Sequence, residues 1–312
     1  MGIIRKSEEI QGVLFIFLSA LMYATLPILG KLAFHAGLSP SAALLLRYVF
    51  SLLLLAVYIG FIKHARILTL TPLVIAQGAL LTMGSLFYFY SLKYLSAGIT
   101  TVIFFFYPVL VACLAVPIYQ EKIRPRLIWA LLLAIAGIIM VSGIDQDLNG
   151  ISYPGVVLAL LACLCYAIYG LIGQKTVAET DPLSMTATLS LVAVIIISFF
   201  ANRDLIFLYH LSLNQILIGL TMAVLNTLLA VLFFLKGVKK IGAARASIIS
   251  TAEPPFCLLL AFLILGETLT LWQLLGSLLV FTSMILASKR SEDSAIPSQS
   301  QRNSFQPHDR RI

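Results

Sequence analysis

Two segments decide the fold: YPVLVACLAVPIYQE at residues 107–121 and EPPFCLLLAFLILGE at residues 253–267. Each has a proline at its second position, and a glutamate follows thirteen residues after that proline, at Glu121 and Glu267. The two segments are separated by a constant register of 146 residues. A spacing that recurs in this way indicates that a segment of the chain has been duplicated.

The duplication extends beyond these segments. In the same register, LKYLSA at 92–97 matches VKKIGA at 238–243. Nearer the N-terminus, a register of 143 residues aligns a tyrosine, Tyr23, with Tyr166, and it aligns the flanking glycines as well. The three-residue change between the two registers is an ordinary difference in loop length. The sequence therefore predicts two homologous halves.

The composition is that of an integral membrane protein. Hydrophobic residues make up 60% of the 312 residues and charged residues only 11%, whereas soluble domains are closer to half apolar and a quarter charged. The apolar residues form about ten runs of the length that crosses a hydrocarbon core, and they lack the alternation of barrel strands. We expect an all-α protein of about ten transmembrane helices, near residues 11–33, 41–62, 72–92, 96–119, 125–143, 153–174, 182–200, 213–236, 242–265 and 270–288.

The net charge of +8 is a signal of topology, not of nucleic-acid binding. If ten spans begin with the N-terminus inside, the inner segments hold sixteen of the twenty-one Lys and Arg residues, and such a bias marks the cytoplasmic side. We therefore expect a multi-pass protein of the cell membrane with both termini in the cytoplasm. An odd number of five spans in each half makes the two halves inverted repeats. The expected units are a cytoplasmic N-terminus (1–10), a first repeat (11–143), a second repeat (153–288) and a disordered, Ser- and Gln-rich cytoplasmic tail (289–312).

Inverted repeats are typical of secondary transporters, whose substrate site lies between the halves near mid-membrane. The paired segments quoted above, each followed by a further apolar span, resemble the EamA-type members of the drug/metabolite transporter superfamily. The arginine of the segment around Arg47 is similar to one often found in the second helix of that family. The resemblance covers roughly residues 10–288. It implies ten helices, cytoplasmic termini, and export or uptake of small metabolites such as amino acids.

Glu253 is the one acidic residue that we place in mid-membrane, about eleven residues into its run and so about 16 Å deep. Since the bilayer interior disfavours a charged carboxylate, a carboxyl at this depth suits a proton carrier or a partner for a substrate ammonium group. A second interpretation is structural, with Glu253 capping backbone groups freed by Pro254 and Pro255. The resemblance favours this second interpretation, because Glu-Pro at this place looks common among members with different substrates.

Prolines fall near the middle of two predicted helices, at Pro108 and at Pro254–Pro255. Because proline lacks an amide donor and clashes with the preceding turn, we expect both helices to be kinked. A kink frees a carbonyl at the depth of the site. These positions are therefore predicted to act as hinges or to shape the cavity, with static kinks as the alternative.

Tyr23, Tyr107 and Tyr166 also lie near mid-span, away from the interfacial belts where tyrosine usually resides. Tyr107 is the first-half equivalent of Glu253. Aromatic walls around a polar cavity would suit amphipathic or aromatic substrates, and helix packing is the alternative. Asn226 in the eighth span is a further cavity candidate, or else an interhelical hydrogen-bonding residue. Arg47 lies about six residues from an outer helix end, where it can snorkel or hold a carboxylate near the outer mouth.

Other function classes are not supported. The four histidines show no metal-ligand spacing such as HExxH, no Gly-x-Ser-x-Gly elbow occurs, and no Walker A sequence is present. We expect no enzyme activity, no cofactor and no metal. The expected function is secondary transport of small organic metabolites, most of all amino acids or related compounds, in the direction of export, with proton coupling as one mode. The alternatives are a non-transporting receptor or structural membrane protein, and a transporter of sugar-like or nucleobase metabolites or of xenobiotics.

Overall fold

A computed structural model describes residues 2–63, 67–91, 94–95, 97–119, 125–142, 152–200, 211–265 and 269–288. These residues form helices joined by short connections, and no strand occurs among them. Helices are the expected solution, because a lipid environment offers no partner for an unpaired backbone amide or carbonyl. Glu121, Glu267 and the predicted tail at 289–312 lie outside the described residues.

Eight helical segments are long and apolar enough to cross a membrane, and two shorter apolar helices, Pro125–Val141 and Leu271–Ala287, complete the ten. This confirms the predicted all-α membrane architecture. Numbered as spans in chain order, they are span 1, α1 (Gly2–Ala24) and α2 (Leu26–His35); span 2, α3 (Pro40–Val57) and η1 (Tyr58–Lys63); span 3, α4 (Pro72–Ser91); span 4, α5 (Ala97–Phe104) and α6 (Tyr107–Tyr119); span 5, α7 (Pro125–Ser142); span 6, α8 (Tyr153–Glu179); span 7, α9 (Pro182–Phe200); span 8, α10 (Leu213–Met222), η4 (Ala223–Leu229) and α11 (Ala230–Ile241); span 9, α12 (Ala243–Ser250), α13 (Glu253–Leu260) and η5 (Ala261–Leu265); and span 10, α14 (Leu271–Ser288).

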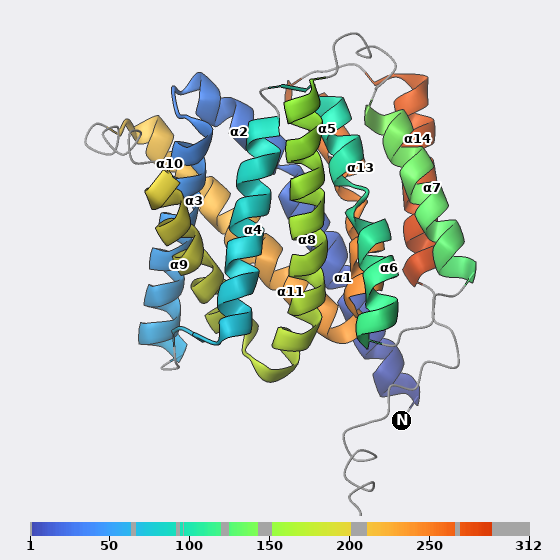
Figure 1. The fold of residues 1–312 in the computed structure, drawn as a ribbon, viewed down its shortest axis with the longest axis horizontal. Helices are drawn as coiled ribbons and strands as arrows, with labels where there is room; N and C mark the ends of the chain where they lie inside the picture. The colour runs from blue at the N-terminus through green and yellow to red at the C-terminus, as the bar shows by residue number, and fades with distance from the viewer. Residues whose placement is uncertain are drawn as a thin grey trace, which may run out of the picture.

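The spans pack with an internal pseudo-twofold symmetry (Figure 1). Span 3 packs against span 6, and the exchanged pair, span 1 and span 8, is also in contact. Spans 2, 4 and 5 pack against their own equivalents, spans 7, 9 and 10. Contacts that recur when the halves are exchanged are those of two equivalent repeats, as an inverted repeat requires. The centre of the molecule is consequently formed by both halves.

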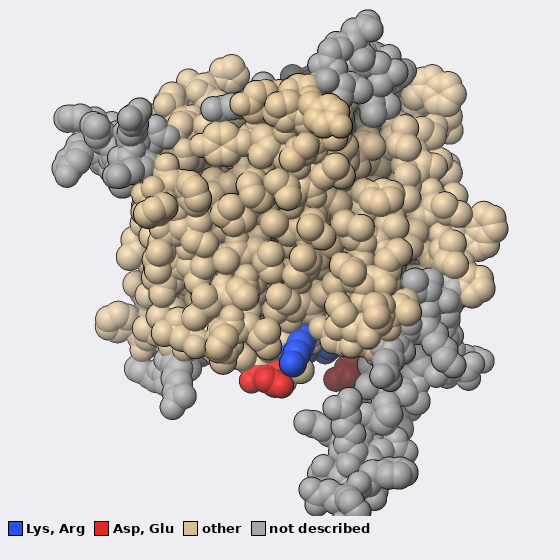
Figure 2. Space-filling view, in the orientation of Figure 1, with Lys and Arg blue, Asp and Glu red and all other residues tan. Residues whose placement is uncertain are grey.

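The charged residues are placed as a bilayer requires. Across its middle, the face in Figure 2 shows no lysine, arginine or acidic residue among the described atoms, and the coloured residues lie at its lower edge. Large hydrophobic side chains are exposed on the outer helices, for example Trp129 of α7 and Leu278 of α14. A broad exposed apolar surface on a helical protein is suited to contact with lipid rather than with water.

The expected proline kinks are complete breaks. Span 4 stops at Phe104 and restarts at Tyr107, so that Pro108 lies in the first turn of α6. Span 9 stops at Ser250 and restarts at Glu253, with Pro254 and Pro255 in the first turn of α13. The first turn is where a helix tolerates proline, because the amides there have no intrahelical acceptor in any case.

A third break, which the sequence analysis did not identify, divides span 1 at Thr25, and Pro27 lies in the first turn of α2. The equivalent of Pro27 in the second half is Gly170, which lies inside the continuous helix α8. The two halves therefore differ at this point, and the difference concerns the backbone as well as the side chains.

A buried polar network satisfies the backbone at this third break. Asn226 of η4 donates from Nδ2 to the carbonyl of Met22 at 2.7 Å and to the hydroxyl of Thr25 at 2.9 Å. Arg47 of α3 donates from Nη2 to the carbonyl of Asn226 at 2.7 Å and from Nε to the hydroxyl of Thr227 at 2.7 Å. The network joins spans 1, 2 and 8 at a place where span 1 is interrupted and span 8 is a π-helix, whereas span 2 is regular there.

Arg47 does not snorkel. Its side chain is 1% exposed, and it lies between α3 and η4 with its guanidinium 5.0 Å from the centre of the Tyr48 ring. Its distance along the helix from an outer end is short, but it points sideways into the neighbouring span instead of toward the end of its own helix. The neutral acceptors of η4 explain this orientation.

Substituting Asn226 tests the network. Asn226→Ala removes two hydrogen bonds at a buried site and should lower the free energy of unfolding by about 1–3 kcal/mol. Thermal unfolding of the purified protein in detergent measures the effect. The control is Asn214→Ala, an exposed position in the first turn of α10, which should stay within about 0.5 kcal/mol of the wild type. Equal melting temperatures for the two variants would contradict the structural role of Asn226.

The last helices of the two halves form a tight pair at one end of the molecule, α7 and α14 (Figure 1). A Cβ atom added at Gly137 would meet the carbonyl oxygen of Gly276 at 2.7 Å, and one added at Gly276 would meet that of Gly137 at the same distance. Ser283 donates to the carbonyl of Ala130 at 2.6 Å across the same interface. Small residues in these two helices thus allow their backbones to come together.

The same substitution at two glycines separates packing from helix propensity. Gly137→Ala inserts a methyl group against a backbone carbonyl and should destabilise the protein by about 1–3 kcal/mol. Gly170→Ala places the methyl group in open space, so it should be neutral or should stabilise α8 by up to about 1 kcal/mol. Melting temperatures in detergent compare the two variants, and a loss as large at Gly170 as at Gly137 would show that packing is not the cause.

Candidate functional site

A cavity of about 210 Å³ lies in the middle of the molecule, between the two halves. Its wall includes the residues that open the second helix of each of the three broken spans: Leu26 and Pro27 of α2, Tyr107 of α6 and Glu253 of α13. The cavity therefore lies where the regular helices are interrupted. Backbone irregularity inside a membrane is tolerated where it borders a cavity, and discontinuous helices form the sites of many transporters.

Aromatic residues make up half of the wall. Nine of the eighteen lining residues are aromatic, namely Tyr23, Phe34, Tyr88, Phe89, Phe104, Tyr107, Tyr166, Tyr169 and Phe234. Many of them are in contact with one another. The Phe104 ring lies 4.8 Å from that of Tyr166 in an edge-on arrangement, and Tyr169 stacks on Phe234 with ring centres 5.8 Å apart. Such a wall presents apolar ring faces and a few hydroxyl groups to a ligand.

The hydroxyl groups are held at defined positions. The Tyr88 side chain lies beside Thr101 and that of Tyr166 beside Ser85, so that each hydroxyl has a polar neighbour. The Tyr107 hydroxyl lies 3.5 Å from the carbonyl oxygen of Ser247, to which it donates. A ligand in the cavity would thus meet polar groups fixed in position by their neighbours.

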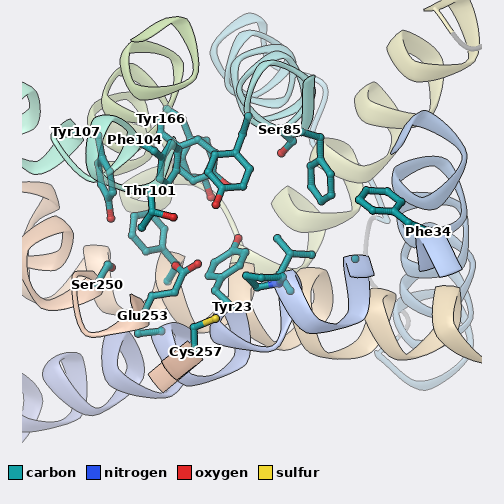
Figure 3. Close-up of a pocket in the computed structure, with 18 residues that line it drawn as sticks. Tyr23, Phe34, Ser85, Thr101, Phe104, Tyr107, Tyr166, Ser250, Glu253 and Cys257 are labelled. Atoms are coloured by element: carbon teal, nitrogen blue, oxygen red, sulfur yellow. The ribbon is translucent and has the colours of Figure 1, made fainter. Parts of the chain in front are cut away.

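Glu253 is the single formally charged residue in the cavity wall. It is the first residue of α13, directly after the break at Thr251 and Ala252, and a carboxylate in the first turn of a helix is favoured by the helix dipole. Its side chain is partly exposed to the cavity, and it forms no ion pair within the described part of the chain. Figure 3 shows the carboxyl group directed into the space beside Tyr23, Thr101 and Cys257.

The structure sorts the residues predicted from the sequence into two groups. Tyr23, Tyr107, Tyr166 and Glu253 line this one cavity, as Figure 3 shows. Asn226 does not line it but lies in the network at the break of span 1, so it acts between helices, as the alternative interpretation held.

The remaining predicted residues surround the cavity without lining it. Pro108, Pro254 and Pro255 are buried in the first turns of α6 and α13 and set the positions of Tyr107 and Glu253. Arg47 is also absent from the wall, but its hydrogen bond to Asn226 links it to Met22 and Thr25, close in sequence to the cavity residue Tyr23. It is a charge held one layer behind the wall.

Sequence reasoning missed several lining residues, among them Tyr88, Phe104 and Tyr169. Tyr169 had a usable signal, because it follows Tyr166 by three residues and so lies on the same face of α8. Pro27 had one as well, since a proline in mid-span indicates an interrupted helix as clearly as Pro108 does. Tyr88 and Phe104 had none, because aromatic residues are abundant throughout the chain.

Comparison with known proteins agrees with this architecture. The sequence pattern of the EamA-like transporter family matches residues 10–143 and again residues 153–289. The uncharacterized transporter YyaM of Bacillus subtilis is 27% identical over 212 residues, which cover 64% of this chain and 67% of YyaM. The threonine/homoserine exporter RhtA of Escherichia coli K12 is 29% identical over 216 residues, which cover 69% of each protein.

A solved crystal structure has the same fold. It superposes with a TM-score of 0.75 over 88% of this chain and 96% of its own, at 16% sequence identity. The two matches to the family pattern together span most of the sequence, one in each half. The chain belongs to the EamA-like transporter family.

Proposed function

We propose that the protein is a secondary transporter that exports amino acids or closely related amine-bearing compounds through the cavity between its two halves. The observation that supports this most strongly is the position of Glu253. A single carboxylate stands at a helix break, in a cavity otherwise lined by aromatic and small polar residues. A carboxylate in such surroundings pairs with a substrate ammonium group, and the aromatic faces pack against the substrate body.

The interruption of three spans at the cavity supports alternating access. α12 and α13 are separate helices joined by a two-residue turn, and so are α5 and α6. Segments joined in this way can change their relative angle without the loss of helical hydrogen bonds. Because the halves are inverted repeats, a change in one half and its counterpart in the other would expose the cavity to opposite sides in turn.

The relatives bear on substrate and direction. RhtA is named for the export of threonine and homoserine, and both compounds carry an ammonium group of the kind that Glu253 suits. Export of such compounds is therefore the function that we propose for this chain. Proton coupling stays a prediction, as does the cytoplasmic position of both termini.

Reconstitution tests the proposal. Proteoliposomes containing the purified protein should exchange radiolabelled amino acids from a panel that includes threonine, homoserine and phenylalanine. Glu253→Gln removes the charge while preserving the shape of the side chain, and it should reduce exchange about thirtyfold, as expected when one partner of a buried charged pair is lost. The matched control is Glu179→Gln, at the exposed C-terminal end of α8, which should exchange substrate at the wild-type rate.

Two results would count against the proposal. The first is an absence of exchange for every compound of the panel by a folded wild-type protein, which would favour a receptor or structural role. The second is full exchange by Glu253→Gln, which would show that the substrate amine does not depend on this carboxylate.

A further inference from the structure

Two formally charged side chains lie in the interior of the described helices, Glu253 in the cavity wall and Arg47, which is buried behind that wall. The contacts of Arg47 in the described structure are to neutral groups, the carbonyl of Asn226, the hydroxyl of Thr227 and the ring of Tyr48. Its charge is therefore not cancelled by direct contact. Through Asn226, Arg47 is linked to Met22 and Thr25, which lie on either side of the cavity residue Tyr23 along the chain.

This arrangement restricts the net charge that the cavity can accept. A guanidinium remains protonated in proteins, so Arg47 contributes a permanent positive charge. With Glu253 ionised, the protein interior is neutral, and a zwitterionic substrate keeps it neutral. A monocationic amine of the same shape leaves one uncompensated positive charge, which is costly inside a membrane.

The cavity also has donors for a negative group. Tyr23 and Tyr166 are equivalent residues of the two halves, and both line the cavity. Figure 3 shows Tyr23, Tyr166 and Glu253 around the same space. Deeper in the same region, the buried hydroxyls of Tyr48 and Tyr169 have no hydrogen-bond partner in the described structure. The Tyr169 hydroxyl of the wall and the Tyr48 hydroxyl outside it are therefore donors that no acceptor of the described structure uses.

We propose that the cavity selects zwitterions and holds them in one orientation, with the ammonium group at Glu253 and the carboxylate at the hydroxyls of Tyr23 and Tyr166, where the buried guanidinium of Arg47 balances its charge. The inference rests on the proposed function, because it names the substrate class of the same cavity. Arg47 acts on the substrate through the tyrosines and through its field, so it is a positioning residue.

Three probes that share the same side chain test the contacts of the ammonium group and of the carboxylate separately. Phenylalanine carries both charges, phenethylamine lacks the carboxylate, and N-acetylphenylalanine lacks the ammonium group. In calorimetric titration of the purified wild-type protein in detergent, the affinity for phenylalanine should be at least about tenfold higher than the affinity for either analogue. If the exchange panel selects threonine, which is the smaller amino acid, the equivalent set of probes is threonine, 1-amino-2-propanol and N-acetylthreonine.

Variants of the protein then test which residues bind the substrate carboxylate. Arg47→Met should abolish the preference for phenylalanine over phenethylamine, and Lys175→Met, which removes an exposed cation from α8, should retain it. The double variant Tyr23→Phe, Tyr166→Phe removes two hydroxyl groups without changing ring packing and should reduce the preference at least about fivefold. The readout is a ratio of two affinities in one sample, so a loss of folded protein does not alter it.

The outcomes separate the inference from the proposed function. Binding of none of the probes, together with no exchange of the amino-acid panel, overturns the proposed function. Wild-type binding of phenethylamine that equals or exceeds that of phenylalanine leaves the transport proposal standing and overturns the inference. An unchanged ratio of the affinities for phenylalanine and phenethylamine in folded Arg47→Met overturns the role of Arg47. If that variant does not fold, an unchanged ratio in the double tyrosine variant overturns the proposed binding of the substrate carboxylate at Tyr23 and Tyr166.

Discussion

The rest of the structure depends on one constraint: a backbone amide or carbonyl inside a bilayer must have a partner. Three spans of this protein are interrupted near their middles, and each interruption needs local compensation. At span 1 the compensation comes from Asn226 and Thr25, with Asn226 itself bonded by Arg47. At spans 4 and 9 it comes from tight turns, in which amides such as those of Phe106 and Ala252 donate to carbonyls three residues earlier. The compensated breaks create the cavity, so the cost of irregular backbone and the presence of a site have the same origin.

The two halves use this constraint differently. The break in span 4 begins α6 with Tyr107, and the equivalent break in span 9 begins α13 with Glu253. The break in span 1 has no equivalent in α8, where Gly170 takes the place of Pro27. Duplication accounts for the common framework of contacts. Two of the differences lie at the cavity, where Glu253 is the equivalent of Tyr107 and Pro27 that of Gly170, whereas Tyr23 and Tyr166 preserve the symmetry there.

Sequence alone predicted the helices, their number and the inverted halves, because apolar length and charge bias are properties of the chain itself. It also brought Tyr23, Tyr107, Tyr166 and Glu253 to one depth, and the structure places all four around one cavity. The position of a residue along a span gives its depth in the membrane, but it does not show which neighbouring helix the side chain faces. Asn226 and Arg47 lie at suitable depths but point toward neighbouring helices, which only the packing decides. For the same reason a proline in a span signals an interruption without showing whether the helix bends there or ends.

The position of Glu253 at the start of α13 has a mechanical consequence. The carboxylate is attached to a helix that is joined to α12 through Thr251 and Ala252 alone. A ligand that moves this carboxylate applies force to α13 within two residues of the connection about which the helix would turn. Because the force acts close to this connection, a small displacement of the ligand would produce a larger displacement of the far end of α13, toward the membrane surface. Recognition and movement would then be performed by the same residue.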